Sequence, residues 1–165
     1  MTQRYVIMGV SGCGKSSIGV AFAAAIGGIF IDGDDLHPDA NVAKMASGRP
    51  LNDEDRAPWL VKVGQALQGG TGPVVIGCSA LKRRYRDIIR QEADPLVTFL
   101  HLAGSRKVLL ARMAARTGHF MPPSLLDSQL AALEPPSADE TAITVNIDQT
   151  PHDVLAELLR KVGKQ

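Results

Sequence analysis

Apolar and polar positions divide the chain into two kinds of segment. Short runs made almost wholly of apolar residues are typical of strands buried on both faces of a parallel sheet; they lie at 5–8, 29–31, 73–78, 97–102 and 143–147. Longer stretches with apolar residues at helical spacing separate them; they lie at 17–26, 38–46, 53–67, 81–91, 105–115, 124–133 and 151–162. This alternation predicts an α/β fold, with a five-stranded, mostly parallel sheet and helices on both faces.

Turn and capping residues predict where several helices begin and end. Gly27–Gly28 marks a helix stop, and Ser105 is of the residue type that caps a helix start. Ser124–Asp127 resembles a capping box with Asp in place of the usual Glu or Gln, and predicts a helix start there. Thr150–Pro151 predicts the start of the last helix, because proline is favoured at the first helical position.

Composition excludes several classes of protein. The 165 residues allow a sizeable core, and we expect one domain spanning 1–165. Lysine and arginine number 18 against 17 acidic residues, so the net charge of +1 offers no basic field for nucleic acid. We expect neither a membrane span nor a signal peptide, since no apolar run approaches roughly 18 residues. Cys13 and Cys78 are too few for a disulfide framework, so a cytoplasmic location is expected.

A glycine-rich stretch follows the first apolar run directly. Gly9–Ser16 reads G-x-x-x-x-G-K-S, the phosphate-binding P-loop, between a predicted strand and a predicted helix. Its backbone N–H groups and the positive end of the helix dipole suit the phosphates of ATP. Lys15 provides charge for the outer phosphates, and Ser16 a hydroxyl for Mg²⁺. The expected nucleotide-binding residues are Gly9, Val10, Ser11, Gly12, Cys13, Gly14, Lys15, Ser16 and Ser17.

Cys13 lies inside this loop and allows two interpretations. A thiol near a helix N-terminus can have a lowered pKa, and a bulky reagent on Cys13 is predicted to block nucleotide binding by crowding the loop. The simpler alternative is that Cys13 and Cys78 are ordinary small residues.

Acidic residues follow the second apolar run. Ligands of parallel sheets bind at the carboxyl ends of the strands, so Asp32 and Asp34 are expected beside the P-loop. A carboxylate here can orient the waters of Mg²⁺. The third apolar run lacks the terminal aspartate that many P-loop proteins use for the metal, and Asp32 is the nearest substitute. A carboxylate can also accept a hydroxyl proton as phosphate transfers. Both Asp32 and Asp34 are candidates for this base.

Six further stretches carry a more specific signal. They are D-G-D-D-L-H-P at Asp32–Pro38, N-V-A-K-M-A-S-G at Asn41–Gly48, P-L-N-D-E-D-R-A-P-W-L at Pro50–Leu60, C-S-A-L-K-R-R-Y-R-D at Cys78–Asp87, G-H-F-M-P at Gly118–Pro122 and L-E-P-P at Leu133–Pro136. Together they span almost the whole chain, which resembles the gluconate kinases of the small P-loop type, similar in design to shikimate kinase. The resemblance implies the P-loop NTPase fold, phosphorylation of D-gluconate at its 6-hydroxyl by ATP, Mg²⁺ as cofactor and a homodimer.

A gluconate site needs a cation for the substrate carboxylate and polar groups for the hydroxyls. The expected substrate-binding residues are Asp34, His37, Asn41, Arg49, Arg56, Ser79, Lys82, Arg83 and His119. Arg56 is preferred for the carboxylate because its guanidinium fork matches a carboxylate bidentately. At least one member of Lys82–Arg84 is expected on a solvated helix face, and Trp59 is expected in the core.

By the same resemblance, residues 112–123 form a short helical lid. Arg112 and Arg116 lie four apart, on one helix face. Arg112 is expected to stack on adenine, and Arg116 to reach the phosphates as a catalytic group together with Lys15. Asp148–Pro151 is expected at the edge of the adenine.

Two other functions are compatible with a P-loop. One is a kinase for another small hydroxy acid, such as shikimate, or for a nucleoside monophosphate; the scarcity of aromatic residues, 4%, speaks against a base pocket. The other is a nucleotide-dependent switch without a small-molecule acceptor. Guanine-specific switches carry N-K-x-D and D-x-x-G, and neither string occurs in the chain.

Overall fold

A single parallel sheet forms the centre of the protein. The computed structural model describes residues 3–93, 96–115 and 122–163. The strands are β1 (Arg4–Met8), β2 (Ile29–Asp32), β3 (Val74–Gly77), β4 (Thr98–Ala103) and β5 (Ala142–Asn146). Their order is β2-β3-β1-β4-β5, and every neighbouring pair is parallel. The predicted five-stranded α/β sheet is confirmed.

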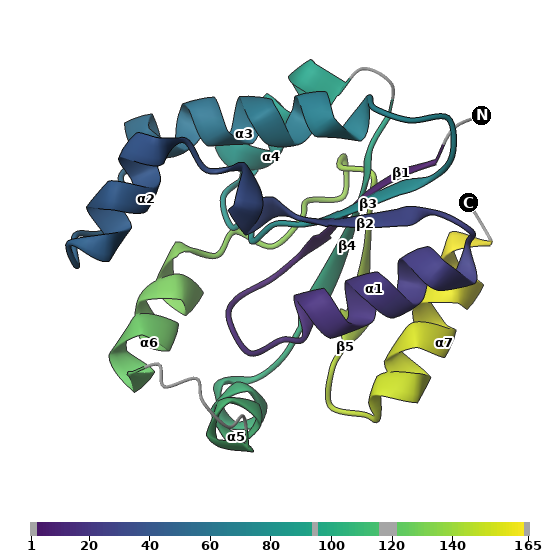
Figure 1. Ribbon diagram of the computed structural model, residues 1–165. Helices are drawn as coiled ribbons and strands as arrows, with labels where there is room; N and C mark the ends of the chain where they lie inside the picture. Colours follow the sequence, from purple (N-terminus) through teal and green to yellow (C-terminus); the bar gives the residue numbers. More distant parts are fainter. Residues whose placement is uncertain (1–2, 94–95, 116–121, 164–165) are drawn as a thin grey trace.

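Helices connect the strands and cover both faces of the sheet. They are α1 (Lys15–Ala25), the 3₁₀ helix η1 (Gly33–Leu36), α2 (Asp39–Ala46), α3 (Asp53–Leu67), α4 (Arg83–Ala93), α5 (Arg106–Ala115), α6 (Pro123–Ala132) and α7 (Pro151–Val162). Helices α1 and α7 lie on one face, and α3 and α4 on the other (Figure 1). Among the described residues, no helix is both long and apolar enough to cross a membrane.

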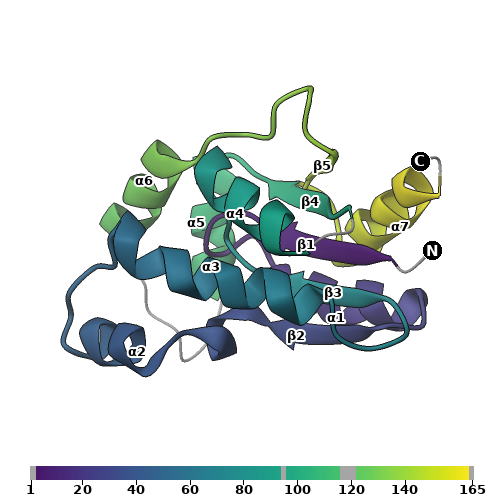
Figure 2. The same cartoon turned by 90° about the horizontal axis from the view of Figure 1, so that it is seen from above.

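Each face of the sheet has its own hydrophobic core. Phe22 of α1 and Leu158 of α7 are fully buried in one core, and Leu60 of α3 and Phe99 of β4 in the other. Burying one such side chain contributes about 1.5–3 kcal/mol. Trp59 is only 4% exposed and belongs to the second core, as predicted. The two cores fix the sheet and leave its carboxyl edge to the loops, beside which α2, α5 and α6 lie (Figure 2).

Three of the four predicted capping signals are confirmed. Gly27 has φ +71°, Ser105 Oγ accepts from the Val108 N–H at 3.2 Å, and Thr150 Oγ1 accepts from the Asp153 N–H. The capping box at Ser124–Asp127 was wrong. Helix α6 begins one residue earlier, at Pro123, and has no side-chain cap. Proline has no N–H to satisfy at this position, and the Asp127 carboxylate instead pairs with Arg106 of α5 at 2.6 Å.

Candidate active site

The P-loop joins the end of β1 to the start of α1 and requires glycine for steric reasons. Gly9 has φ +146°, and a Cβ there would lie 2.8 Å from Cys13 Sγ and 2.9 Å from the Leu102 carbonyl oxygen. Gly14 is left-handed, with φ 93°, and immediately precedes the first turn of α1. That turn contains no acidic residue, and Ser16 and Ser17 in it are exposed. An uncompensated helix N-terminus of this kind favours an anion.

Lys15 and Ser11 show how the loop is held. Lys15 Nζ donates to the carbonyl oxygens of Gly9 at 2.9 Å and Val10 at 3.2 Å, so its charge lies across the loop. The Ser11 N–H donates to Gln129 Oε1 of α6 at 2.7 Å. No sequence motif pointed to Gln129, because the two residues are 118 positions apart.

Cys13 is buried, with 1% of its surface exposed. Burial raises the pKa of its thiol, although Lys15 acts in the opposite direction. Burial also raises the pKa of Cys78, to about 12. Both thiols are therefore protonated at neutral pH, which favours the simpler interpretation of two ordinary buried residues over a reactive thiolate.

The structure separates the two carboxylates that follow β2. Asp32 Oδ1 accepts from the Asp34 N–H at 3.0 Å and caps η1. The Asp34 carboxylate makes no hydrogen bond or ion pair with any described residue. Asp34 is exposed, but partial desolvation of its carboxylate still raises its pKa; the Asp32 charge adds to this rise, while His37 and Lys15 lower the pKa. Asp34 thus has the free oxygens and the raised pKa that suit a base.

His37 is fixed in one tautomer beside Asp34. Its ring stacks on Trp59, with 4.1 Å between ring centroids, and Trp59 Nε1 donates to the Gly33 carbonyl oxygen at 2.8 Å. Asn41 Nδ2 lies 3.2 Å from His37 Nδ1 and donates to the Asp55 carbonyl oxygen at 2.9 Å. The amide nitrogen can only donate, so Nδ1 accepts and the ring proton lies on Nε2. Burial lowers the pKa of His37, which keeps this neutral donor at pH 7.

Arg56 of α3 faces the phenol of Tyr85 on α4. Arg56 Nη1 lies 3.4 Å from Tyr85 Oη, and the guanidinium lies 5.7 Å from the ring centroid. Tyr85 Oη in turn donates to Asp53, which also accepts from Lys82 at 3.4 Å and from Arg84 at 2.9 Å. Arg56 has no carboxylate partner among the described residues, so its fork is available to an anion.

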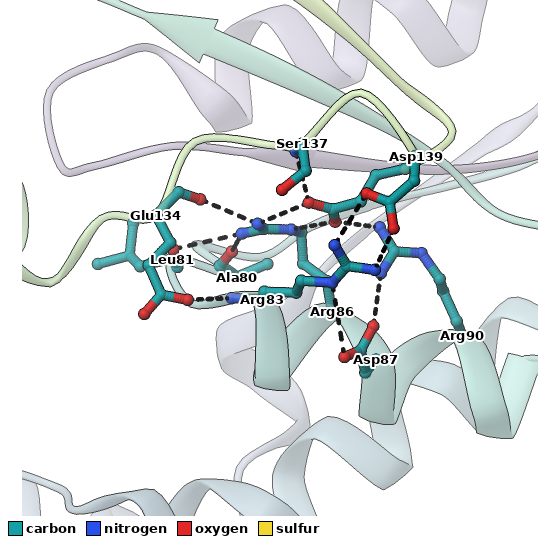
Figure 3. A network of polar contacts seen from close by, with 10 residues as sticks. Ala80, Leu81, Arg83, Arg86, Asp87, Arg90, Glu134, Ser137 and Asp139 are labelled. Carbon is teal, nitrogen blue, oxygen red and sulfur yellow. Dashed lines mark hydrogen bonds and ion pairs between the residues drawn. The ribbon is translucent and has the colours of Figure 1, made fainter.

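Two of the predicted cations lie elsewhere. Arg49, in the exposed loop between α2 and α3, donates to Ser47 Oγ at 3.1 Å. Arg83 is held bidentately by Asp139, at 2.8 and 2.9 Å, in the network that Figure 3 shows. The side-chain partners of Arg49 and Arg83 in the structure are therefore not the other predicted substrate residues.

Arg86 forms the buried centre of that network. Its Nε and Nη2 donate to the Glu140 carboxylate at 2.7 and 3.0 Å, and both side chains are almost fully enclosed. Its other donors reach the carbonyl oxygens of Ala80, Leu81 and Glu134 (Figure 3). Burial alone raises the pKa of Glu140, but hydrogen bonds from Arg86 and its neighbours outweigh burial and lower it to about 2.

This network holds the loop after β3 in place. Ala80 has φ +44°, an uncommon conformation for a residue with a Cβ, and Arg86 Nη1 bonds its carbonyl oxygen at 2.9 Å. The neighbouring Ser79 carbonyl oxygen accepts from the Gly9 N–H at 3.2 Å. The loop that carries Ser79 and Lys82 is therefore bonded directly to the start of the P-loop.

Of the predicted lid at 112–123, the structure describes residues 112–115 and 122–123. Arg112 of α5 donates to the carbonyl oxygens of Ile147 and Gln149, the latter at 2.9 Å, and so reaches the loop after β5 where the adenine edge was predicted. Arg116 and His119, and the G-H-F-M part of the stretch at Gly118–Pro122, lie outside the described residues.

The residues present suit a magnesium nucleotide. In the described part of the chain, no group of three or more His, Cys, Asp or Glu side chains could hold a metal ion by itself. Mg²⁺ bound to a nucleotide needs only one or two protein oxygens, with waters and phosphates supplying the rest. The exposed Ser16 hydroxyl in the first turn of α1 and the Asp32 carboxylate at the end of β2 fit that pattern.

Known proteins resemble the chain over nearly its full length. No family model matches it. The thermosensitive gluconokinase of Escherichia coli strain K12 is 50% identical over 157 residues, which are 92% of this chain and 81% of that protein. The crystal structure of a gluconokinase from Sinorhizobium meliloti 1021 is 48% identical and has a TM-score of 0.90, covering 98% of this chain and 92% of that one. Shikimate kinase from Bacteroides thetaiotaomicron, 17% identical with a TM-score of 0.68 over 98% of both chains, shares the fold.

Proposed function

This chain belongs to the gluconokinase family, and from that premise we propose that it transfers the terminal phosphoryl group of ATP to the 6-hydroxyl of D-gluconate, giving 6-phospho-D-gluconate and ADP. The observation that carries the proposal is the Asp34 carboxylate, which has no partner among the described residues and lies within electrostatic reach of Lys15 and His37. A phosphate-binding loop with a base beside it is what phosphoryl transfer to an alcohol requires.

In this proposal Asp34, rather than Asp32, is the base. Asp32 Oδ1 is committed to the cap of η1, whereas both oxygens of Asp34 are available to a hydroxyl. Its raised pKa makes Asp34 a stronger base than an ordinary carboxylate. The proton leaves the substrate hydroxyl for Asp34 as the new phosphorus–oxygen bond forms.

The acceptor is held by groups on η1, α2, α3 and the loop after β3. Arg56 binds the gluconate carboxylate, because its guanidinium has no carboxylate partner among the described residues. His37 Nε2–H donates to a substrate hydroxyl, and Asn41 Oδ1 accepts from another. Lys82, which shares Asp53 with Arg84, adds positive charge on the acceptor side of the site.

The nucleotide end depends on the P-loop and on the lid. The backbone N–H groups of the loop and Lys15 bind the phosphates, and Ser16 and Asp32, the latter through water, hold Mg²⁺. When bound, the ion neutralises charge on the outer phosphates. Arg112 borders the adenine through the loop after β5, and Arg116 approaches the phosphates when the site closes.

ADP release tests the proposal. We expect rapid release with gluconate and none above background with shikimate, nucleoside monophosphates or no acceptor. Release without an acceptor would favour a nucleotide-dependent switch, and release with shikimate would favour the alternative hydroxy acid.

The family resemblance also leads us to propose a cytoplasmic homodimer that binds neither nucleic acid nor membrane. Light scattering at micromolar concentration should give twice the chain mass of 17.6 kDa.

A further inference from the structure

A side chain from α6 touches the P-loop, and nothing in the proposed mechanism uses it. The Ser11 N–H, at the third position of the loop, donates to Gln129 Oε1 at 2.7 Å. Backbone N–H groups of a P-loop normally point at phosphate oxygens. Here the Ser11 N–H donates instead to the neutral side-chain carboxamide of Gln129, so this carboxamide lies beside the phosphate-binding loop.

The contact fixes how the carboxamide is oriented. An N–H can only donate, so the atom that faces Ser11 is the carboxamide oxygen, and the nitrogen, Nε2, is the other terminal atom. Nε2 carries two hydrogens, and neither has a partner among the described residues. Gln129 is half-buried, and its bond to Ser11 holds the carboxamide beside the loop, where Nε2 is accessible to a ligand.

Contacts near its middle and just after its last residue hold α6 in place. Near its middle, Asp127 accepts from Arg106 of α5 at 2.6 and 3.3 Å, and Leu126 is fully buried in the core. Just after α6, the Glu134 N–H donates to the Leu81 carbonyl oxygen at 2.7 Å, and Glu134 Oε1 accepts from the Arg83 N–H at 2.9 Å (Figure 3). Gln129 therefore projects from a helix that is anchored to α5 on one side and to the loop after β3 on the other.

From this geometry we propose that Gln129 is a phosphate-contacting residue: its Nε2–H₂ group donates to the terminal phosphoryl group of the nucleotide. The assignment rests on the proposed function for the identity of that nucleotide. Lys15 supplies charge to the outer phosphates, and a neutral, oriented donor adds hydrogen bonding where negative charge spreads over the equatorial oxygens during transfer.

Nucleotide affinity tests this without any acceptor, so its result is separate from whether gluconate is the substrate. We expect Gln129→Leu, which has neither donor nor acceptor, to weaken ATP binding about tenfold or more in calorimetry with Mg²⁺. ADP lacks the terminal phosphoryl group, so its affinity should change less than threefold. Ser128→Ala, at an exposed neighbouring position on α6, is the matched control and should bind both nucleotides normally.

Gln129→Glu separates the donor from the acceptor. It keeps an oxygen for the Ser11 N–H but replaces Nε2–H₂ by a second, anionic oxygen. We expect ATP binding and kcat to fall at least as far as in Gln129→Leu, with the melting temperature of both variants close to that of the parent. Wild-type behaviour in Gln129→Glu would show that only the bond to Ser11 matters, and tighter ATP binding in Gln129→Leu would show that Gln129 competes with phosphate; either result overturns the proposal.

Discussion

Two groups of polar side chains differ in what surrounds them. The acceptor cluster (Asp34, His37, Arg56, Lys82 and Tyr85) includes the exposed Asp34 and the half-buried Arg56, which has no carboxylate partner among the described residues. The Arg86 network (Arg83, Arg86, Arg90, Glu134 and Glu140) is enclosed at its centre, where the Arg86 side chain has no exposed surface (Figure 3).

The two groups meet different segments of the chain because they lie on different sides of the start of α4. Arg83, Arg86 and Arg90 recur at three- and four-residue spacing and face the loop after α6, whereas Lys82 and Tyr85 face Asp53 of α3. An enclosed guanidinium whose donors are all bonded positions backbone. A partly exposed one can exchange its partner for a ligand. The enclosed Arg86 of α4 thus has a structural role, whereas the role proposed for the half-buried Arg56 of α3 is to bind a ligand.

The largest expected effect is at Asp34. Asp34→Asn removes the base and should lower kcat by roughly 10²–10⁴-fold, while ATP binding and the melting temperature stay near the parent values. Stopped-flow ADP release and calorimetry measure the two quantities. Asp35→Asn is the matched control, since Asp35 is an exposed neighbour in η1. Turnover within threefold of the parent in Asp34→Asn would exclude Asp34 as the base.

The Arg86 network should respond in stability. Arg86→Met leaves Glu140 buried without its main partner and should cost about 3–5 kcal/mol of unfolding free energy in urea at pH 7. Replacing both partners, as Arg86→Met with Glu140→Leu, should recover part of this loss, because no buried charge is then left. If Arg86→Met alone is as stable as the parent, the enclosed Arg86–Glu140 ion pair is contradicted.

Arg56 should respond in substrate affinity. Arg56→Gln should raise the KM for gluconate roughly 10–100-fold, because a charge-assisted bond to the substrate carboxylate is lost. The unfolding midpoint should stay close to that of the parent. Lys62→Gln, an exposed position on the same helix, is the control. An unchanged KM in Arg56→Gln would assign the carboxylate to another cation.

The pH profile tests the coupling of the two aspartates. Asp34 must be ionised to act, so kcat/KM should fall as the pH drops through its pKa, which lies above the ordinary carboxyl value. The Asp32 charge contributes to that rise, so Asp32→Asn should move the acid limb to lower pH. If the acid limb stays in place or moves to higher pH in Asp32→Asn, the limb does not report the ionisation of Asp34.

The smallest effect is expected at Arg83. Its pair with Asp139 is exposed, and exposed pairs contribute little to stability. Arg83→Ala should therefore leave both the unfolding midpoint and the KM for gluconate close to those of the parent, in contrast to Arg86→Met and Arg56→Gln. A raised KM would restore Arg83 to the substrate site.

The sequence by itself determined those features of the protein that depend on residues close together in the chain. Alternating apolar runs and helical spacing predicted the sheet and its helices, and the P-loop, with its glycines and Lys15, was identified from eight consecutive residues. These features depend on backbone conformation and on periodicity, both of which are local. The carboxylates after β2 were also predicted, because a parallel sheet brings its strand ends to one edge.

Only the tertiary structure decided how those groups are used. It assigned Asp32 to a cap and left Asp34 available, separated Arg83 from Arg56, and brought Gln129 to Ser11 across 118 positions. The physical reason is that burial and partner choice are set by segments far apart in the chain. The sequence gives the chemistry of each side chain, while the fold determines which atoms it meets and how much water surrounds it.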